Sequence, residues 1–168
     1  MQRTRAWMSS TEIRQHSTRA AVDLQALVQW IFFTIYVGNN DSHAKNLSMY
    51  TLPGEGVRLT PFYDLMCTRL YPGLSKEFAV NIGEQVPPGQ MGHAALQGLA
   101  KKLGMKPRYI QTVAQELATK IPMAIDQAIE ELTPTLSAGS RTFATHWGHE
   151  VKSNTQEAAT RFQENTKA

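Results

Sequence analysis

The chain has 168 residues, of which 42% are apolar, and this length and composition allow one domain with a buried core. Its 17 basic and 14 acidic residues give a net charge of +3, and only a loose concentration of basic residues occurs, between Arg3 and Arg19. An excess this small and dispersed argues against a nucleic-acid-binding surface. The single cysteine, Cys67, excludes an intramolecular disulfide and a cysteine-based zinc site, so we expect a cytoplasmic protein.

The most apolar segment spans residues 22–37 and has few polar interruptions. Asp23 stands near its start and Gly38 directly follows its end, a pattern that predicts a helix buried on nearly all sides. Its longest apolar run, residues 31–37, is far shorter than the roughly 20 residues of a membrane-spanning helix. We therefore expect no membrane association. The polar N-terminus also lacks the apolar core of a secretion signal and is a candidate for disorder.

A polar loop at residues 38–46 follows this helix and reads GNNDSHAKN. Alternating apolar and polar residues at 47–50 and 57–60 flank a turn-forming stretch and predict a β-hairpin. Asp64 stands at the exit of this hairpin among aromatic and aliphatic neighbours. Residues 66–92 are rich in glycine and proline, so we expect an irregular segment there.

The chain beyond residue 92 is predicted to be helical. Residues 93–103 fit a short helix closed by Gly104, and Pro107 suits the first turn of the next helix. Residues 132–139 break the helical pattern, and a polar helix is expected from about residue 140 to residue 162, before a charged tail. The apolar stripe expected on the second of these helices consists of Ile110, Val113, Leu117, Ile121, Ala124 and Ala128.

Three polar residues match the pattern required for phosphoryl transfer. This reaction needs a carboxylate that accepts the proton of the attacking hydroxyl, and oxygen ligands that hold magnesium on the ATP phosphates. Protein kinases supply an Asp, an Asn five positions later, a short hairpin and a second Asp. Asp41, Asn46 and Asp64 occur here in that order and spacing. Each residue alone is a weak signal, since Asp and Asn are common in turns and caps, but the ordered combination is specific.

Residues 38–48 and 59–64 together resemble the signature of HipA-like toxin kinases, the kinase half of bacterial toxin-antitoxin systems. The likeness covers roughly residues 15–150, which we expect to form the core of a single domain spanning 1–168 with polar termini. It implies a mainly α, protein-kinase-like C-terminal lobe of the HipA type, a helical bundle with a short β-hairpin after the catalytic loop. It further implies Asp41 as the catalytic base, Asn46 and Asp64 as ligands of Mg²⁺, and ATP as the phosphate donor.

The same loop carries two further catalytic candidates, His43 and Lys45. For His43 the favoured interpretation is a histidine that bridges loop carbonyls, and the alternative is direct contact with phosphate or substrate. Lys45 either reaches a phosphate or is solvated. Elsewhere, His146 and His149 are spaced as on one helix face, but no further ligand completes a metal set, so we expect ordinary surface or core histidines.

A kinase also needs a glycine-rich loop over the phosphates and a strand-borne lysine, which in HipA-like proteins lie in an N-terminal lobe. The residues before Val22 supply neither, so we expect that the chain needs such a lobe, either because it is a fragment of a longer protein or because a second chain supplies the lobe. Part of the apolar surface that meets this lobe is then expected to be exposed, with contributions from Trp30, Phe32 or Phe33. The alternative is an inactive domain that binds an antitoxin. The resemblance implies a HipB-like helix-turn-helix antitoxin as partner, contact with DNA only through that antitoxin, and a protein substrate such as glutamyl- or tryptophanyl-tRNA synthetase.

Overall fold

The computed structural model describes residues 10–74 and 91–164. In chain order the elements are α1 (Ser10–His16), α2 (Ala20–Val37), η1 (Ala44–Asn46), β1 (Met49–Leu52), β2 (Gly56–Leu59), η2 (Thr68–Leu70), α3 (His93–Leu103), α4 (Pro107–Leu132), η4 (Thr133–Thr135) and α5 (Ala138–Glu164). This order confirms the mainly α fold with one hairpin after the polar loop. The helix boundaries predicted from Gly104 and Pro107 are also confirmed. The part of the expected irregular segment at residues 75–90 lies outside the described residues.

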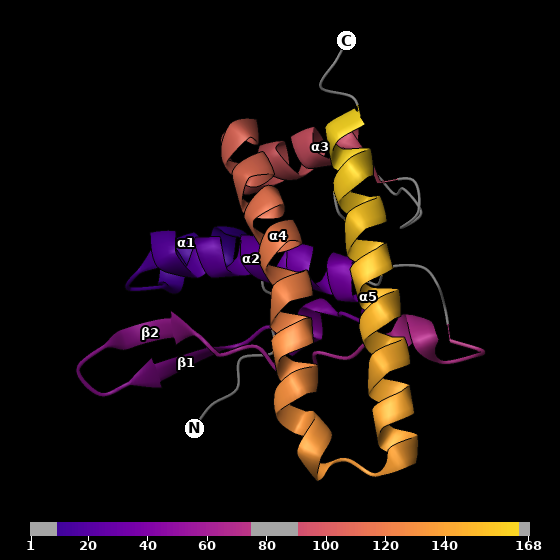
Figure 1. Cartoon of the computed structure of the whole chain (residues 1–168). Helices are drawn as coiled ribbons and strands as arrows, with labels where there is room; N and C mark the ends of the chain where they lie inside the picture. The colour runs from indigo at the N-terminus through magenta and orange to yellow at the C-terminus, as the bar shows by residue number, and fades with distance from the viewer. Residues whose placement is uncertain (1–9, 75–90, 165–168) are drawn as a thin grey trace.

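Helix α2 lies at the centre of the core. Figure 1 shows α4 and α5 as a long antiparallel pair that crosses α2, and both helices contact it. The Tyr36 hydroxyl, fully buried on α2, donates a hydrogen bond of 3.0 Å to the Ala114 carbonyl of α4. By length and a mean hydropathy of 1.5, α2 alone would suit a membrane span, but 61% of its residues are buried inside the protein, as is usual for the core helix of a folded domain.

The expectation of exposed aromatic residues on α2 is wrong for Trp30 and Phe32. Trp30 and Phe32 are buried, and Phe33 is partly buried against the same core. The ring of Trp30 stacks on Phe62, 6.0 Å away between centroids, and Phe32 meets Phe162 edge to face at 5.8 Å. Segments far along the chain thus cover these rings.

The core also extends beyond the expected limits of residues 15–150. Ile13 of α1 is fully buried, in a region predicted to be polar and a candidate for disorder. At the other end, Ala158 and Phe162 of α5 are buried as well. These isolated apolar residues stand in polar stretches, so only their contacts with distant helices show that they belong to the core.

The predicted apolar stripe of α4 is confirmed only as far as Ile121. Beyond it, Ile125 is buried and Ile129 partly buried, whereas Ala124 and Ala128 are exposed. The buried face therefore advances by four residues at each step, as the helical period of 3.6 allows. Gly148 of α5 makes room for these side chains, because a Cβ atom there would lie 3.1 Å from Ile125 Cγ2.

The β-hairpin is attached to α2 through one buried carboxylate, that of Asp23. β1 and β2 pair antiparallel, with Met49 opposite Leu59. Asp23 accepts hydrogen bonds from Ser17 Oγ at 2.6 Å, from Arg58 Nη2 at 2.9 Å and from the Leu59 amide at 2.9 Å. Burial by itself would raise the pKa of Asp23, but the hydrogen bonds, led by that from Arg58, outweigh it and hold the pKa below its ordinary value.

Candidate active site

The polar loop begins where α2 ends at Gly38. This residue has a φ of 72°, and its amide donates to the Ile35 carbonyl, a common way for a helix to end. The position requires glycine, because the backbone is left-handed and a Cβ atom would lie 3.1 Å from Arg69 Cβ. The chain therefore turns sharply out of the core at this point, and the next residues are presented at its edge.

Asp41 and His43 form a pair on this loop. His43 Nε2 lies 2.8 Å from Asp41 Oδ1, and the side chains are 45% and 69% exposed, respectively. The favoured interpretation of His43 was a bridge between loop carbonyls, and in the structure its Nε2 atom instead faces the Asp41 carboxylate. With a proton on Nε2, the imidazole donates to Asp41 Oδ1 and orients its carboxylate, which remains exposed to solvent.

Asn46 and Asp64 meet although they are separated by the whole hairpin. Asn46 Nδ2 donates a hydrogen bond of 2.7 Å to Asp64 Oδ2. Asp64 has a φ of 59°, and it is the non-glycine residue with positive φ among those described. Such a left-handed conformation is uncommon outside glycine, although Asp adopts it more readily than most residues. The backbone at Asp64 is thus turned so that its carboxylate reaches the end of η1.

A set of hydrogen bonds that we call the loop clasp joins the start of the polar loop to the segment after Asp64. The buried side chain of Asn39 donates from Nδ2 to the Asp64 carbonyl at 2.9 Å. Thr68 Oγ1 accepts from the Asn40 amide at 2.8 Å and donates to the Gly38 carbonyl at 3.3 Å. The Arg69 amide also donates to the Gly38 carbonyl, at 3.1 Å. The clasp holds Asp64 in place relative to the loop that carries Asp41.

Asn39 and Thr68 were not among the residues expected to matter for the site. In the sequence, Asn39 stands in a run of turn-forming residues, and Thr68 stands in a segment with no regular pattern. The one available signal was that Asn39 follows Gly38, the residue at which the buried helix ends. Because buried polar side chains nearly always have partners, a partner for Asn39 could have been anticipated, but not its identity.

Tyr63 connects the segment before Asp64 to the backbone of η1. Its hydroxyl lies 3.1 Å from Ser48 Oγ and donates to the Lys45 carbonyl at 3.3 Å. The backbone at Lys45 is thereby held next to the residue that precedes Asp64. The Lys45 side chain is exposed at the surface of η1.

The pair Asn46 and Asp64 fits Mg²⁺ better than a metal that requires a complete protein cage. Over residues 10–74 and 91–164, no three His, Cys, Asp or Glu side chains form a potential metal cluster. The hydrogen bond between Asn46 and Asp64 uses the amide nitrogen, so the amide oxygen and the exposed carboxylate remain available as oxygen ligands. Mg²⁺ binds in this manner, through one or two protein oxygens together with phosphates and water.

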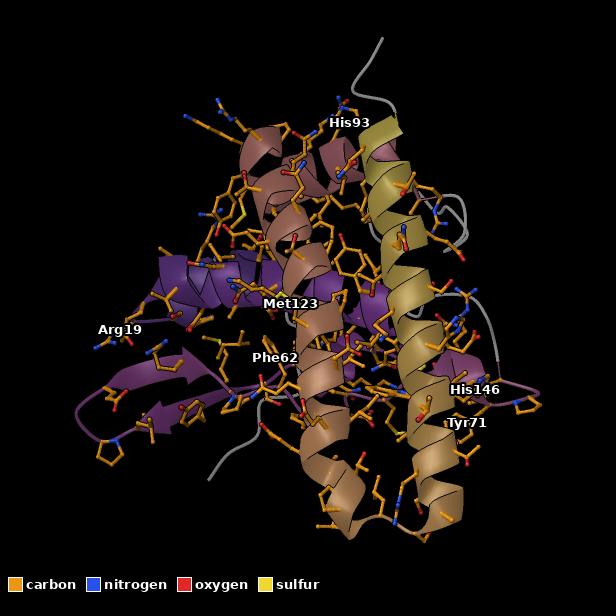
Figure 2. The ribbon with its side chains drawn as sticks, viewed as in Figure 1. Arg19, Phe62, Tyr71, His93, Met123 and His146 are labelled. Atoms are coloured by element: carbon orange, nitrogen blue, oxygen red, sulfur yellow. The ribbon has the colours of Figure 1, made fainter. Side chains whose placement is uncertain are left out.

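His146 and His149 lie outside this arrangement. Both are exposed on α5, and His149 Nδ1 is 3.7 Å from a carboxylate oxygen of Glu150. Figure 2 shows His146 on the outer side of the α4–α5 pair, away from the hairpin. They are surface histidines, one of the two outcomes expected.

Comparisons with known proteins identify relatives of the chain. A putative kinase of Sinorhizobium fredii, Y4mE, is 31% identical over 119 residues, which make up 71% of this chain and 28% of that protein. The serine/threonine-protein kinase toxin HipA of Shewanella oneidensis is 29% identical over 123 residues, 73% of this chain and 28% of that protein. The chain thus spans less than a third of the length of these relatives.

The fold has a solved counterpart in the Shewanella oneidensis toxin-antitoxin complex of HipA, HipB and operator DNA. One chain of that structure matches with a TM-score of 0.75 and 23% identity, over 91% of this chain and 38% of its own length. The HipA-like C-terminal domain family matches residues 7–125, more than half of the chain. From the polar loop, the hairpin and these matches together, we conclude that the chain belongs to the HipA-like C-terminal domain family.

Proposed function

We propose that the chain is the catalytic-loop lobe of a serine/threonine protein kinase, which transfers the γ-phosphate of ATP to a hydroxyl group of a protein. The observation that carries this proposal is the meeting of Asn46 and Asp64 across the hairpin, at 2.7 Å, with Asp41 five residues before Asn46 on the same loop. Kinase chemistry needs these groups in this order. The kinase names of two relatives support the same class of reaction.

Each residue of the loop then has a defined task. Asp41 accepts the proton of the attacking hydroxyl, and His43 orients the Asp41 carboxylate through their 2.8 Å contact. Asn46 and Asp64 would hold Mg²⁺ through their oxygens, and the ion would supply positive charge to offset that of the ATP phosphates. Lys45 is exposed on the same loop and contacts a phosphate.

The remaining parts of the reaction are proposed from the resemblance. The glycine-rich loop and its lysine come from an N-terminal lobe, consistent with a chain that spans 28% of its curated relatives. The protein substrate is an aminoacyl-tRNA synthetase, and the reaction takes place in the cytoplasm. The partner is a HipB-like antitoxin that mediates contact with DNA, as supported by the composition of the solved complex.

Binding of Mg²⁺ should depend on the nucleotide. Because Asn46 and Asp64 offer few oxygen ligands, Mg²⁺ alone should bind this chain with a Kd above about 1 mM. Addition of ATP, with the glycine-rich lobe supplied as a second chain, should produce saturable binding. Isothermal titration calorimetry measures both. Asp64→Asn should abolish the saturable component, and tight binding of Mg²⁺ without nucleotide would contradict the proposed role of this pair.

The test of the function itself is reconstitution. The chain and its glycine-rich lobe are incubated with Mg²⁺, labelled ATP and candidate synthetases, and transfer of label to Ser or Thr is the expected result. If the assembled protein transfers no phosphate to any acceptor yet binds the antitoxin, the domain is a docking module and the kinase proposal fails.

A further inference from the structure

A buried asparagine on α5 contacts the end of the helix that leads to the site. Asn154 is only 7% exposed, and its Nδ2 donates to the carbonyls of Ile35 and Tyr36, each at 2.8 Å. These carbonyls belong to the last turn of α2, where carbonyls lack complete helical pairing. Asn154 therefore caps the end of the helix from which the polar loop emerges, although it lies more than a hundred residues further along the chain.

The same side chain also contacts the other half of the loop clasp. Asn154 Oδ1 accepts a short hydrogen bond from Arg69 Nη1. The amide of Arg69 in turn donates to the Gly38 carbonyl at 3.1 Å, and Arg69 directly follows Thr68 of the clasp. One amide group thus connects the helix that leads to Asp41 with the segment that follows Asp64.

Packing alone does not account for a polar side chain here. An apolar residue of similar size would fill the space between α5 and α2 without the cost of burying an amide, whereas an asparagine is tolerated only if its hydrogen bonds are made. Asn154 makes them with both its nitrogen and its oxygen, and it directs them to the two segments that must keep a constant separation.

We propose that Asn154 is a positioning residue of the phosphoryl-transfer site. Through Arg69 and the end of α2 it holds the segment of Asp64 at a constant position relative to the loop of Asp41. This inference rests on the proposed kinase function for its catalytic consequence, but the coupling of the two segments can be measured without catalysis.

The first test uses hydrogen exchange in the 168-residue chain. Asn154→Ala should speed the exchange of the Arg69 amide about tenfold relative to wild type, because the bond to Gly38 loses its lateral support. Thr155→Val is the matched control. Thr155 is 1% exposed, and its hydroxyl donates to the Val151 carbonyl at 2.8 Å and, at 3.4 Å, to the Tyr36 carbonyl, so Thr155→Val removes a contact with the end of α2 but leaves the bond between Asn154 and Arg69 in place. This variant should leave Arg69 as protected as in wild type. Equal protection of Arg69 in all three proteins overturns the inference.

If Asn154→Ala folds poorly, Arg69→Met tests the proposed positioning role instead. Arg69 is exposed overall, so its replacement by an unbranched apolar side chain removes the link without opening the core. In the reconstituted kinase, each variant should lower kcat about tenfold and raise the Mg²⁺ concentration needed for half-maximal rate, with KM for the protein substrate unchanged. The kcat of the double variant should be no lower than that of the more impaired single variant, because both substitutions remove the same hydrogen bond between Asn154 and Arg69.

The possible failures are distinguishable. If Asp41→Ala inactivates the kinase while Asn154→Ala and Arg69→Met retain the wild-type rate, the positioning role is wrong and the proposed function stands. If the two effects simply add, Asn154 does not act through Arg69 and the inference is likewise overturned. If wild type transfers no phosphate, the proposed function fails, and the exchange measurement alone decides whether Asn154 couples the two segments.

Discussion

Replacing Asp41 by Ala in the reconstituted kinase should lower the rate of phosphate transfer about 10³-fold, because the attacking hydroxyl loses the group that accepts its proton. Asp64→Ala should be at least as severe, since it removes the only carboxylate of the proposed metal pair and the acceptor of the 2.7 Å hydrogen bond from Asn46. Asn46→Ala should approach the same loss. Transfer of labelled phosphate to the acceptor protein, measured under single-turnover conditions, gives these rates.

Asp126→Ala is the matched control for the loss of an exposed carboxylate. Asp126 lies on α4 with its side chain 63% exposed and pairs with Lys152 at 2.5 Å, whereas the Asp41 side chain is 69% exposed. An exposed pair contributes little to stability, so this variant should keep both fold and rate. His146→Ala should likewise change little. Inhibition of bacterial growth should disappear in the Asp41→Ala and Asp64→Ala variants and persist in the two controls. Full activity of Asp41→Ala would exclude Asp41 as the base.

Asp23→Ala should be the most damaging polar substitution for the fold. It removes the acceptor shared by Ser17, Arg58 and Leu59 and leaves the Arg58 guanidinium at a largely buried position without its partner. We expect a decrease of about 2–4 kcal/mol in the free energy of unfolding. Urea denaturation at pH 7 measures it, and an unchanged m-value would show that the cost lies in the folded state. Asp126→Ala, compared in parallel, should cost under about 1 kcal/mol.

Asp23 should also make stability depend on pH. Its pKa is lower in the folded protein than in the unfolded chain, so the unfolded chain binds the proton more readily. The stabilisation is therefore complete above the ordinary Asp pKa of about 3.9 and is lost as the pH falls through that value toward the lower folded one. Asp23→Asn should remove this part of the acid dependence. If wild type and Asp23→Asn lose stability in parallel below pH 5, the carboxylate does not contribute as described.

Replacement of Asp23 should also disturb the site, because Asp23 attaches the hairpin to α2. The Leu59 amide is held by Asp23 at 2.9 Å, and Asp64 follows β2 by five residues. Because Asn46 and Asp64 lie on opposite sides of this hairpin, its attachment to α2 helps to set their separation. A variant destabilised at Asp23 should therefore lose phosphate transfer before it unfolds completely.

Local patterns in the sequence determined the elements and the chemical class of the site. A buried helix, a glycine that ends a helix and a proline that starts one are recognisable from neighbours within a few residues, which is why α2, α3 and the start of α4 occur where expected. The spacing of Asp41 and Asn46, the hairpin and Asp64 likewise depends on order along the chain. For these features no knowledge of distant contacts was needed.

Only the tertiary structure decided how these parts are held together. Asn39 reaches Asp64, Asn154 reaches the end of α2 and Arg69, and the rings of Trp30 and Phe32 are covered by residues far along the chain. The same holds for the shift of the α4 stripe to Ile125, which packs beside Gly148 of α5. A hydrogen bond or ring contact between residues tens of positions apart depends on the relative placement of whole helices, and a polar residue in a turn has the same local pattern whether it is solvated or buried.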